Sequence, residues 1–131
     1  MTKRTNGSTG ASHASSSPLE STIINAIQDR KGLKITKINF SGLDTAPAET
    51  FIVCQGNSTS QVAAIADNIR EEVLDKLNVK PYNYDGYRNS QWIVIDYGNL
   101  LVHVFVPDAR EYYNIEDLWS DAHQTEIPDL D

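Results

Sequence analysis

The sequence predicts an α/β domain with a mixed sheet of about five strands, two long helices on one face of that sheet, and a short C-terminal helix. Two stretches with apolar residues at helical spacing each follow a serine-headed capping signal, and five shorter runs have the composition of strands. A two-residue turn, Gly98-Asn99, joins the last two of these runs. Taken along the chain, these segments give the order α-β-β-α-β-β-β-α.

The two long helices have clear N-terminal signals. Residues 17–20 have the sequence Ser-Pro-Leu-Glu, which is a capping box with proline at the first helical position. Apolar residues then recur at helical spacing, and Gly32 is expected to end this helix. A second capping box, formed by Ser58 and Gln61, opens the longest helix of the chain, and Asn78 is expected to end it.

The strands are shorter and are separated by turn residues. Residues 35–40 alternate apolar and polar side chains, and residues 50–55 have the composition of a short buried strand. Residues 82–84 are expected to form a brief third strand. Residues 91–97 and 100–106 form the two strands of the hairpin, and a short helix over about residues 115–122 follows them.

The hairpin turn determines which residues of its two strands lie opposite each other. Pairing Trp92 with Phe105 and Val94 with His103 gives the hairpin two different faces, since side chains opposite each other share a face. One face is aliphatic and suits packing beneath the helices: Ile93, Ile95, Val102 and Val104. The other, called here the hairpin face, carries Trp92, Val94, Asp96, Leu101, His103 and Phe105.

The hairpin face is either a docking surface or a second layer of core. Exposed aromatic side chains are frequent binding hot spots, and an apolar patch of this kind marks an interaction surface. A third helix or the C-terminal segment would instead bury it. Tyr112, Tyr113 and Trp119 would extend an open patch, whereas Leu118 and Trp119 could equally dock the last helix onto the sheet.

Charge and composition favour a basic protein partner. The chain of 131 residues is 40 % apolar, which is enough for one core, and its net charge is −7. The charge is concentrated in residues 108–131, which hold eight acidic residues against Arg110. Nucleic-acid backbones bind Lys and Arg, so we expect little direct contact with nucleic acid.

Three further expectations concern the organisation and location of the chain. Residues 1–16 are expected to be a disordered extension, residues 17–122 the functional domain, and residues 123–131 an acidic tail. No apolar run approaches the roughly 20 residues that cross a bilayer. The single cysteine, Cys54, excludes an intrachain disulfide and suits the reducing cytoplasm. We therefore expect a cytoplasmic protein without membrane contact.

No pattern of catalytic residues emerges, and we predict neither an enzyme nor a cofactor. Cys54 lies in an apolar strand, where an inert thiol is the usual occupant. His103 has no companions with which to form a metal site. Nucleotidyl transfer would need paired acids to hold two Mg²⁺ ions, and although Gly56-Asn57-Ser58 resembles the turn of such enzymes, Asp96 stands alone on its strand.

Over about residues 19–122, the chain resembles the Iojap or ribosomal silencing factor family. The resemblance is carried by four blocks in this order: residues 51–58 (FIVCQGNS), 61–67 (QVAAIAD), 92–105 (WIVIDYGNLLVHVF), and 110–113 (REYY) with 117–122 (DLWSDA). Each block alone is modest, but the four at these spacings are highly specific. The chain departs from the family pattern at Gly98-Asn99, where the family has Gly-Asp, and at Asp85-Gly86, where it has Glu-Gly.

The resemblance implies a nucleotidyltransferase-like fold without the catalytic acids. It also implies a protein that binds the large-subunit ribosomal protein numbered fourteen, blocks joining of the small subunit, and thereby represses translation. Within the family, the tryptophan and the Asp-Tyr-Gly segment of the hairpin belong to the contact surface. The expected partner-binding residues are therefore Trp92, Val94, Asp96, Tyr97, Gly98, Leu101, His103, Phe105, Tyr113 and Trp119.

Alternative functions remain open. Some members of the family assist large-subunit maturation in organelles, so an assembly factor is one alternative. A degenerate nucleotidyltransferase-like protein that binds nucleotides is another. A homodimer of the free protein through the open face is compatible with the ribosome-bound role, because the same patch could be covered in the dimer and exposed for the ribosome.

Overall fold

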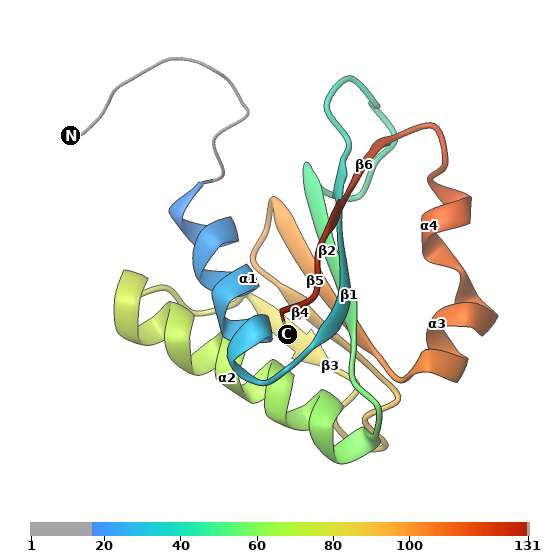
Figure 1. Ribbon diagram of the computed structural model, residues 1–131. Helices are drawn as coiled ribbons and strands as arrows, with labels where there is room; N and C mark the ends of the chain where they lie inside the picture. Colours follow the sequence, from blue (N-terminus) through green and yellow to red (C-terminus); the bar gives the residue numbers. More distant parts are fainter. Residues whose placement is uncertain (1–16, 131) are drawn as a thin grey trace.

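The computed structural model describes residues 17–130, in which six strands form one mixed sheet in the order β3-β4-β5-β2-β1-β6 (Figure 1). The strands are β1 (Leu33–Asn39), β2 (Thr50–Gln55), β3 (Asn83–Asp85), β4 (Trp92–Asp96), β5 (Leu100–Phe105) and β6 (His123–Ile127). The helices are α1 (Pro18–Asp29), α2 (Thr59–Leu77), α3 (Pro107–Tyr113) and α4 (Ile115–Leu118). β2 and β5 run parallel, and the other described neighbours are antiparallel. The predicted extension, residues 1–16, lies outside the described residues.

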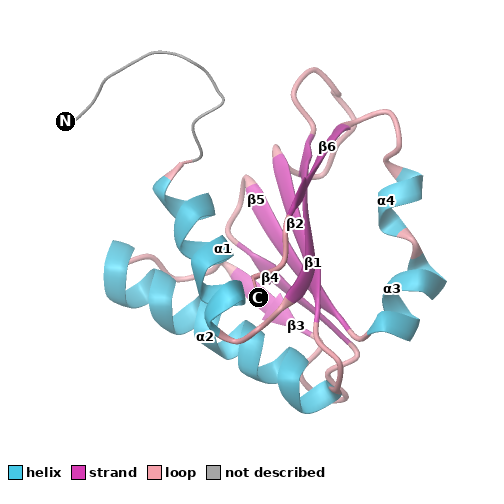
Figure 2. Ribbon diagram, viewed as in Figure 1, coloured by secondary structure: helices cyan, strands magenta, loops and turns pink. Residues whose placement is uncertain are grey.

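The predicted fold class is confirmed. The two long helices, α1 and α2, lie together on one face of the sheet, and the short helices α3 and α4 lie on the other (Figure 2). The sheet has one strand more than the sequence predicted, because β6 adds to its edge beside β1.

The serine of each capping signal caps its helix as predicted. The Oγ of Ser17 accepts the Glu20 N–H at 3.1 Å, and that of Ser58 accepts the Gln61 N–H at 3.1 Å. Asn78 ends α2 in the left-handed conformation, with φ of 55°. These caps satisfy backbone groups that have no partner within the helix.

The end of α1 differs from the expectation that Gly32 stops it. The helix is capped at Arg30, and Lys31 takes the positive φ of 59°. Gly32 is required for a different reason, because a Cβ at this position would overlap Cγ2 of Ile27. The glycine therefore lets the chain pass close to the helix that it has just left.

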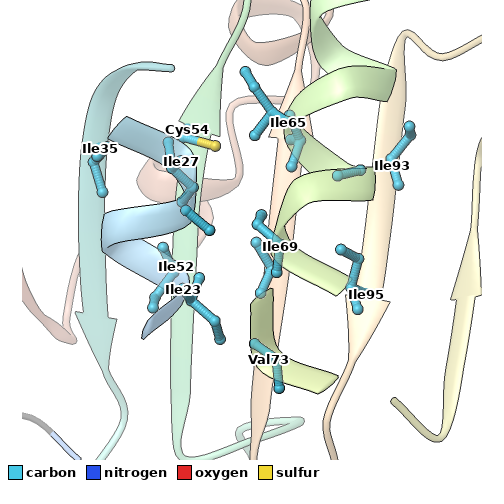
Figure 3. Close-up of a cluster of buried hydrophobic side chains, with 14 of the residues drawn as sticks. Ile23, Ile27, Ile35, Ile52, Cys54, Ile65, Ile69, Val73, Ile93 and Ile95 are labelled. Carbon is cyan, nitrogen blue, oxygen red and sulfur yellow. The ribbon is translucent and has the colours of Figure 1, made fainter. Parts of the chain in front are cut away.

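The main core lies between the sheet and the two long helices (Figure 3). Asn68 on α2 also donates a hydrogen bond from Nδ2 to the Ala26 carbonyl of α1 at 3.0 Å, which fixes one helix against the other. The aliphatic face of the hairpin packs here as predicted. Its four members are completely buried: Ile93, Ile95, Val102 and Val104.

A smaller core lies on the opposite face, beneath α3, α4 and the loop between β1 and β2. Its buried members are Ile38, Phe40, Phe51, Val53, Phe105 and Ile115. This core is built over β1, β2 and β5, whereas β3 contributes no buried residue. The hairpin face is thus partly second core and partly open surface, and both sequence interpretations apply to different parts of it.

The C-terminal quarter departs most from the sequence prediction. A single helix was expected at residues 115–122, but α4 ends at Leu118 and α3 precedes it. Residues 123–131 were expected to be an acidic tail, yet β6 pairs with β1 from Asn39 to Ile35. The Gln124 amide donates to the carbonyls of Glu116 at 2.8 Å and Trp119 at 3.2 Å, so a polar side chain, which gives no apolar pattern in the sequence, ties β6 to the segment before it. The sheet therefore continues past residue 122.

The first prediction tests the structural role of β6. Deleting residues 123–131 should lower the free energy of unfolding by about 3 kcal/mol, because the half-buried Ile127 and the strand pairing are lost. Deleting residues 130 and 131 alone keeps the strand and is the matched control. Urea unfolding followed by far-UV circular dichroism measures both, and equal midpoints for the two truncated chains would contradict the role of β6.

Candidate functional site

The hairpin has the register that the sequence predicts. Trp92 lies opposite Phe105, Val94 opposite His103, and Asp96 opposite Leu101. Phe105 is completely buried, while Trp92 on the neighbouring strand is half-buried. Val94, Asp96 and Leu101 are also half-buried. The hairpin face is consequently accessible mainly along β4.

Trp92 is held by three aromatic neighbours. Its indole Nε1 donates a hydrogen bond to Nδ1 of His103 at 3.1 Å. Its ring stacks on Phe105, with centroids 5.0 Å apart and an interplanar angle of 22°. Tyr113 at the end of α3 also contacts it, with centroids 4.6 Å apart. The indole therefore has one orientation fixed by a polar contact and two ring contacts.

His103 serves as the acceptor that orients this indole. Because Nδ1 accepts the indole hydrogen bond, a neutral ring carries its proton on Nε2. Burial lowers the pKa of His103 from 6.5 to about 4, so the imidazole is neutral at pH 7. Within residues 17–130 its buried Nε2 has no hydrogen-bond partner, and its ring lies against Phe51 with centroids 4.5 Å apart.

The hairpin turn continues the accessible surface towards β3. Oδ1 of Asp96 accepts the Gly98 N–H at 2.7 Å, and Gly98 has φ of 92°, a conformation that glycine adopts without strain. The ring of Tyr82 covers this glycine, and a Cβ on Gly98 would lie 2.8 Å from Tyr82 Cε2. Tyr82 is itself 83 % exposed.

Tyr82 was missed as a site residue by the sequence reasoning. It was assigned to the brief third strand, but it precedes β3, and its backbone N–H donates to the Asp96 carbonyl at 2.8 Å. A large aromatic side chain next to an edge strand was the available signal. Tyr112, 81 % exposed on α3, is a second exposed aromatic beside Tyr113.

Three of the predicted contact residues are buried, so they are not part of the accessible surface of the free protein. Tyr97 is 6 % exposed, because it follows Ile93 and Ile95 onto the helix-covered face and joins the main core. Burial there raises the pKa of Tyr97 to about 12. Phe105 and His103 are 0 % and 5 % exposed, and both rings contact the Trp92 indole.

Two alternatives were open for the last helix: its residues could extend an open patch, or Leu118 and Trp119 could dock it onto the sheet. Trp119 docks against Phe40, with ring centroids 5.0 Å apart, and is half-buried in the smaller core. Leu118 is 72 % exposed and so does not dock onto the sheet. Trp119 therefore anchors the C-terminal segment, and the structure does not bring it to Trp92.

We call the accessible residues of this region the open strip. It consists of Trp92, Val94, Asp96, Gly98, Leu101 and Tyr113, which the sequence predicted, together with Tyr82 and Tyr112. Carboxylates accompany these aromatic side chains. Asp96 lies on the strip, Asp85 lies opposite Val94 on β3, and Glu111 precedes Tyr112 on α3. The open strip thus combines aromatic rings with negative charge.

The turn that resembles that of nucleotidyltransferases is hydrogen-bonded by a side chain of the protein itself, that of Gln61. Oε1 of Gln61 accepts the Asn57 N–H at 2.7 Å, and the Gln61 amide donates to the carbonyls of Arg30 and Lys31 at 3.2 and 3.1 Å. Gln61 thereby joins the turn to the end of α1. Among the described residues, no three His, Cys, Asp or Glu side chains lie where they could hold a metal ion together.

None of the helices in the described part of the chain is long and apolar enough to cross a membrane.

Comparison with known proteins identifies the family. Residues 13–131 match the family described as "Ribosomal silencing factor during starvation". The chain belongs to the ribosomal silencing factor family. Ribosomal silencing factor RsfS of Halalkalibacterium halodurans is 38 % identical over 104 residues, which are 79 % of this chain and 87 % of the relative. The chloroplastic Iojap protein of Arabidopsis thaliana is 36 % identical over 78 residues, 60 % of this chain and 32 % of that protein.

Solved structures agree with this assignment to the silencing factors. A crystal structure of a protein from Chromobacterium violaceum superposes with a TM-score of 0.72 at 33 % identity, covering 78 % of this chain and 83 % of that one. One from Bacillus halodurans gives 0.71 at 33 % identity, with 83 % and 97 % covered. Family membership confirms the predictions of a ribosomal silencing factor and of a protein that is not an enzyme.

The second prediction concerns the pH dependence that His103 creates. Because its pKa is 6.5 when unfolded and about 4 when folded, the unfolded chain binds more protons between these values. The contribution to stability is complete above pH 6.5 and is lost as the pH falls towards 4, up to about 3 kcal/mol. A His103→Gln variant keeps an acceptor for Trp92 but cannot titrate.

Urea unfolding of both chains at pH 7, 5.5 and 4.5 measures this difference. The carboxylates are common to the two chains, so the gap between the curves reports His103 alone. Wild-type stability should fall more steeply with decreasing pH than that of the variant. Parallel pH profiles would contradict the buried, neutral histidine.

Proposed function

We propose that the open strip binds the large ribosomal subunit through its ribosomal protein numbered fourteen and sterically blocks joining of the small subunit. Repression of translation follows from the loss of subunit joining. Membership of the silencing factor family supports this proposal. The observation that carries it is Trp92, a half-buried indole held in one orientation at the uncovered part of the sheet.

The chemistry of the open strip suits a basic protein surface. Tryptophan and tyrosine are the residues that most often dominate the binding energy of protein interfaces. The neighbouring carboxylates of Asp85, Asp96 and Glu111 would attract Lys and Arg side chains and speed the encounter. The same charges would repel nucleic-acid phosphates, so the proposed contact is with ribosomal protein and involves little RNA.

Blocking subunit joining requires no catalytic group. Two partners that need the same ribosomal surface exclude each other, whatever chemistry each uses. An interface of roughly 1,600 Å² in total would be of the standard size for a specific complex. The protein would therefore act while bound to the large subunit, and its effect would depend on the lifetime of that complex.

Co-sedimentation tests the proposal directly. The purified chain is centrifuged with isolated large subunits, isolated small subunits and joined ribosomes. Pelleting with large subunits alone is expected, and absence of pelleting with large subunits would overturn the proposal. Light scattering of the free protein belongs to the same experiment, because a homodimer that covers the open strip would have to dissociate before it binds.

The third prediction is that Trp92→Ala weakens binding to large subunits by at least about 30-fold, or roughly 2 kcal/mol. Leu74→Ala is the control, since Leu74 is 41 % exposed on α2, on the opposite side of the sheet. Far-UV circular dichroism checks that both variants are folded. Undiminished pelleting of the folded Trp92 variant would remove the indole from the interface.

The fourth prediction compares two tyrosines of the same segment. Tyr82→Ala should weaken binding by about fivefold, roughly 1 kcal/mol, because its ring covers Gly98 at the end of the open strip. Tyr84→Ala should leave binding unchanged, because Tyr84 lies beneath Arg70 on the helix side, with 3.7 Å between guanidinium and ring centroid. Equal losses for the two variants would show that the open strip does not extend to Tyr82.

A further inference from the structure

Helix α3 contributes Tyr112 and Tyr113 to the open strip, but apolar contacts alone hold it only weakly on the sheet. It has seven residues, none of them buried, and no side chain caps its N-terminus. Helices of this length are not stable on their own in water, so tertiary contacts must hold α3. Tyr113 at its last position contacts Trp92, and the placement of that ring depends on where α3 lies.

One side chain of α3, Arg110, reaches the sheet and the neighbouring helix. Its Nη1 donates to the Lys34 carbonyl at 2.7 Å and to Gln55 Oε1 at 3.2 Å. Its Nη2 donates to Thr36 Oγ1 at 3.2 Å and to Glu116 Oε2 at 2.7 Å, and its Nε donates to the same carboxylate oxygen at 3.2 Å. The side chain is 11 % exposed. Arg110 thus joins α3 to β1, β2 and α4.

These bonds use every N–H of the guanidinium. Arg110 borders a hollow of about 670 Å³, which Lys34, Glu116 and Asp129 also line. A phosphate or carboxylate ligand would need free N–H donors, and the five donors of Arg110 already have acceptors within the protein. The guanidinium is therefore a structural group, and the hollow beside it is not an anion site built on Arg110.

The backbone conformation at Lys34 directs its carbonyl group to Arg110. The pairing of β1 with β2 is interrupted between Leu33 and Thr36, and Lys34 there has φ of 52°. Its carbonyl accepts from Arg110, while its N–H donates to Asp129 Oδ1 at 2.7 Å. A bulge of this kind redirects a backbone group, and here it directs a carbonyl to α3.

We infer that Arg110 is the positioning residue of the open strip. By fixing α3 on the sheet it sets the place of Tyr113, three residues later on the same helix, and so the wall against which Trp92 rests. Lysine cannot replace it, because an ammonium group donates from a single point and cannot span four acceptors on three elements. The consequence for large-subunit binding rests on the proposed function, whereas the consequence for Trp92 does not.

The fifth prediction uses Arg110→Lys in a Trp119→Phe background, where Trp92 is the single tryptophan. Its fluorescence emission should shift to longer wavelength, as in Tyr113→Ala, because the ring beside the indole is displaced. Binding to large subunits should fall about tenfold. Arg30→Lys is the matched control, since Arg30 is exposed at the end of α1, and it should change neither measurement.

A double-mutant cycle separates positioning from a general loss of stability. Arg110→Lys should weaken binding little further in a chain that already carries Tyr113→Ala, because the loss acts through Tyr113. Additive losses, or an unchanged Trp92 emission in the folded variant, would overturn the inference. If Arg110→Lys does not fold, Glu116→Gln replaces it, because the amide keeps one acceptor oxygen and should give a smaller shift in the same direction.

Failure of the proposed function gives a different result. If the wild-type chain does not pellet with large subunits, the fluorescence comparison of Arg110→Lys, Tyr113→Ala and Arg30→Lys still tests the role of Arg110. If the wild-type chain pellets and Arg110→Lys keeps both its emission and its affinity, the positioning role is wrong and the proposed function stands.

Discussion

The pairing register of β4 and β5 is the constraint on which the rest of the molecule depends. Side chains alternate between the two faces of a strand, so a slip of β4 by one residue would bring Trp92 and Asp96 beneath the long helices and turn Ile93 and Ile95 away from them. The two-residue turn, with Gly98 bonded to Asp96 and bent to a φ that suits glycine, holds the register in place. One hairpin therefore supplies both the aliphatic floor of the main core and the aromatic site.

The extent of the open strip follows from the lengths of the helices. α1 and α2 have 12 and 19 residues and cover their face of the sheet, whereas α3 and α4 have 7 and 4. At about 1.5 Å per residue, the short helices span roughly 10 and 6 Å. Six strands at about 4.8 Å spacing extend over some 24 Å, so these short helices cannot cover the whole of their face of the sheet.

Most of the fold could be predicted from signals that act between residues close in sequence. The elements that were missed depend on contacts between distant residues. Capping boxes, helical spacing and the hairpin turn act within a few residues, and each gave the right element. The α3 helix offered only Pro107 at its start, and β6 is held by contacts of Gln124 that no periodicity reveals. Phe105 and His103 were assigned to the correct face, but their burial depends on packing. Tyr97 was included through the family resemblance, although the alternation of the strand places it with the core.

The clamped indole also has a thermodynamic consequence. A side chain that is mobile in the free protein loses rotational entropy when a partner immobilises it, at about 0.5–1.5 kcal/mol for each such group. The hydrogen bond to His103 and the two ring contacts already restrict Trp92 before any encounter. Folding has thus already restricted Trp92, the principal residue of the proposed contact. If the proposed contact is made, residues that do not touch the partner, such as His103, influence affinity through the entropy of the free state.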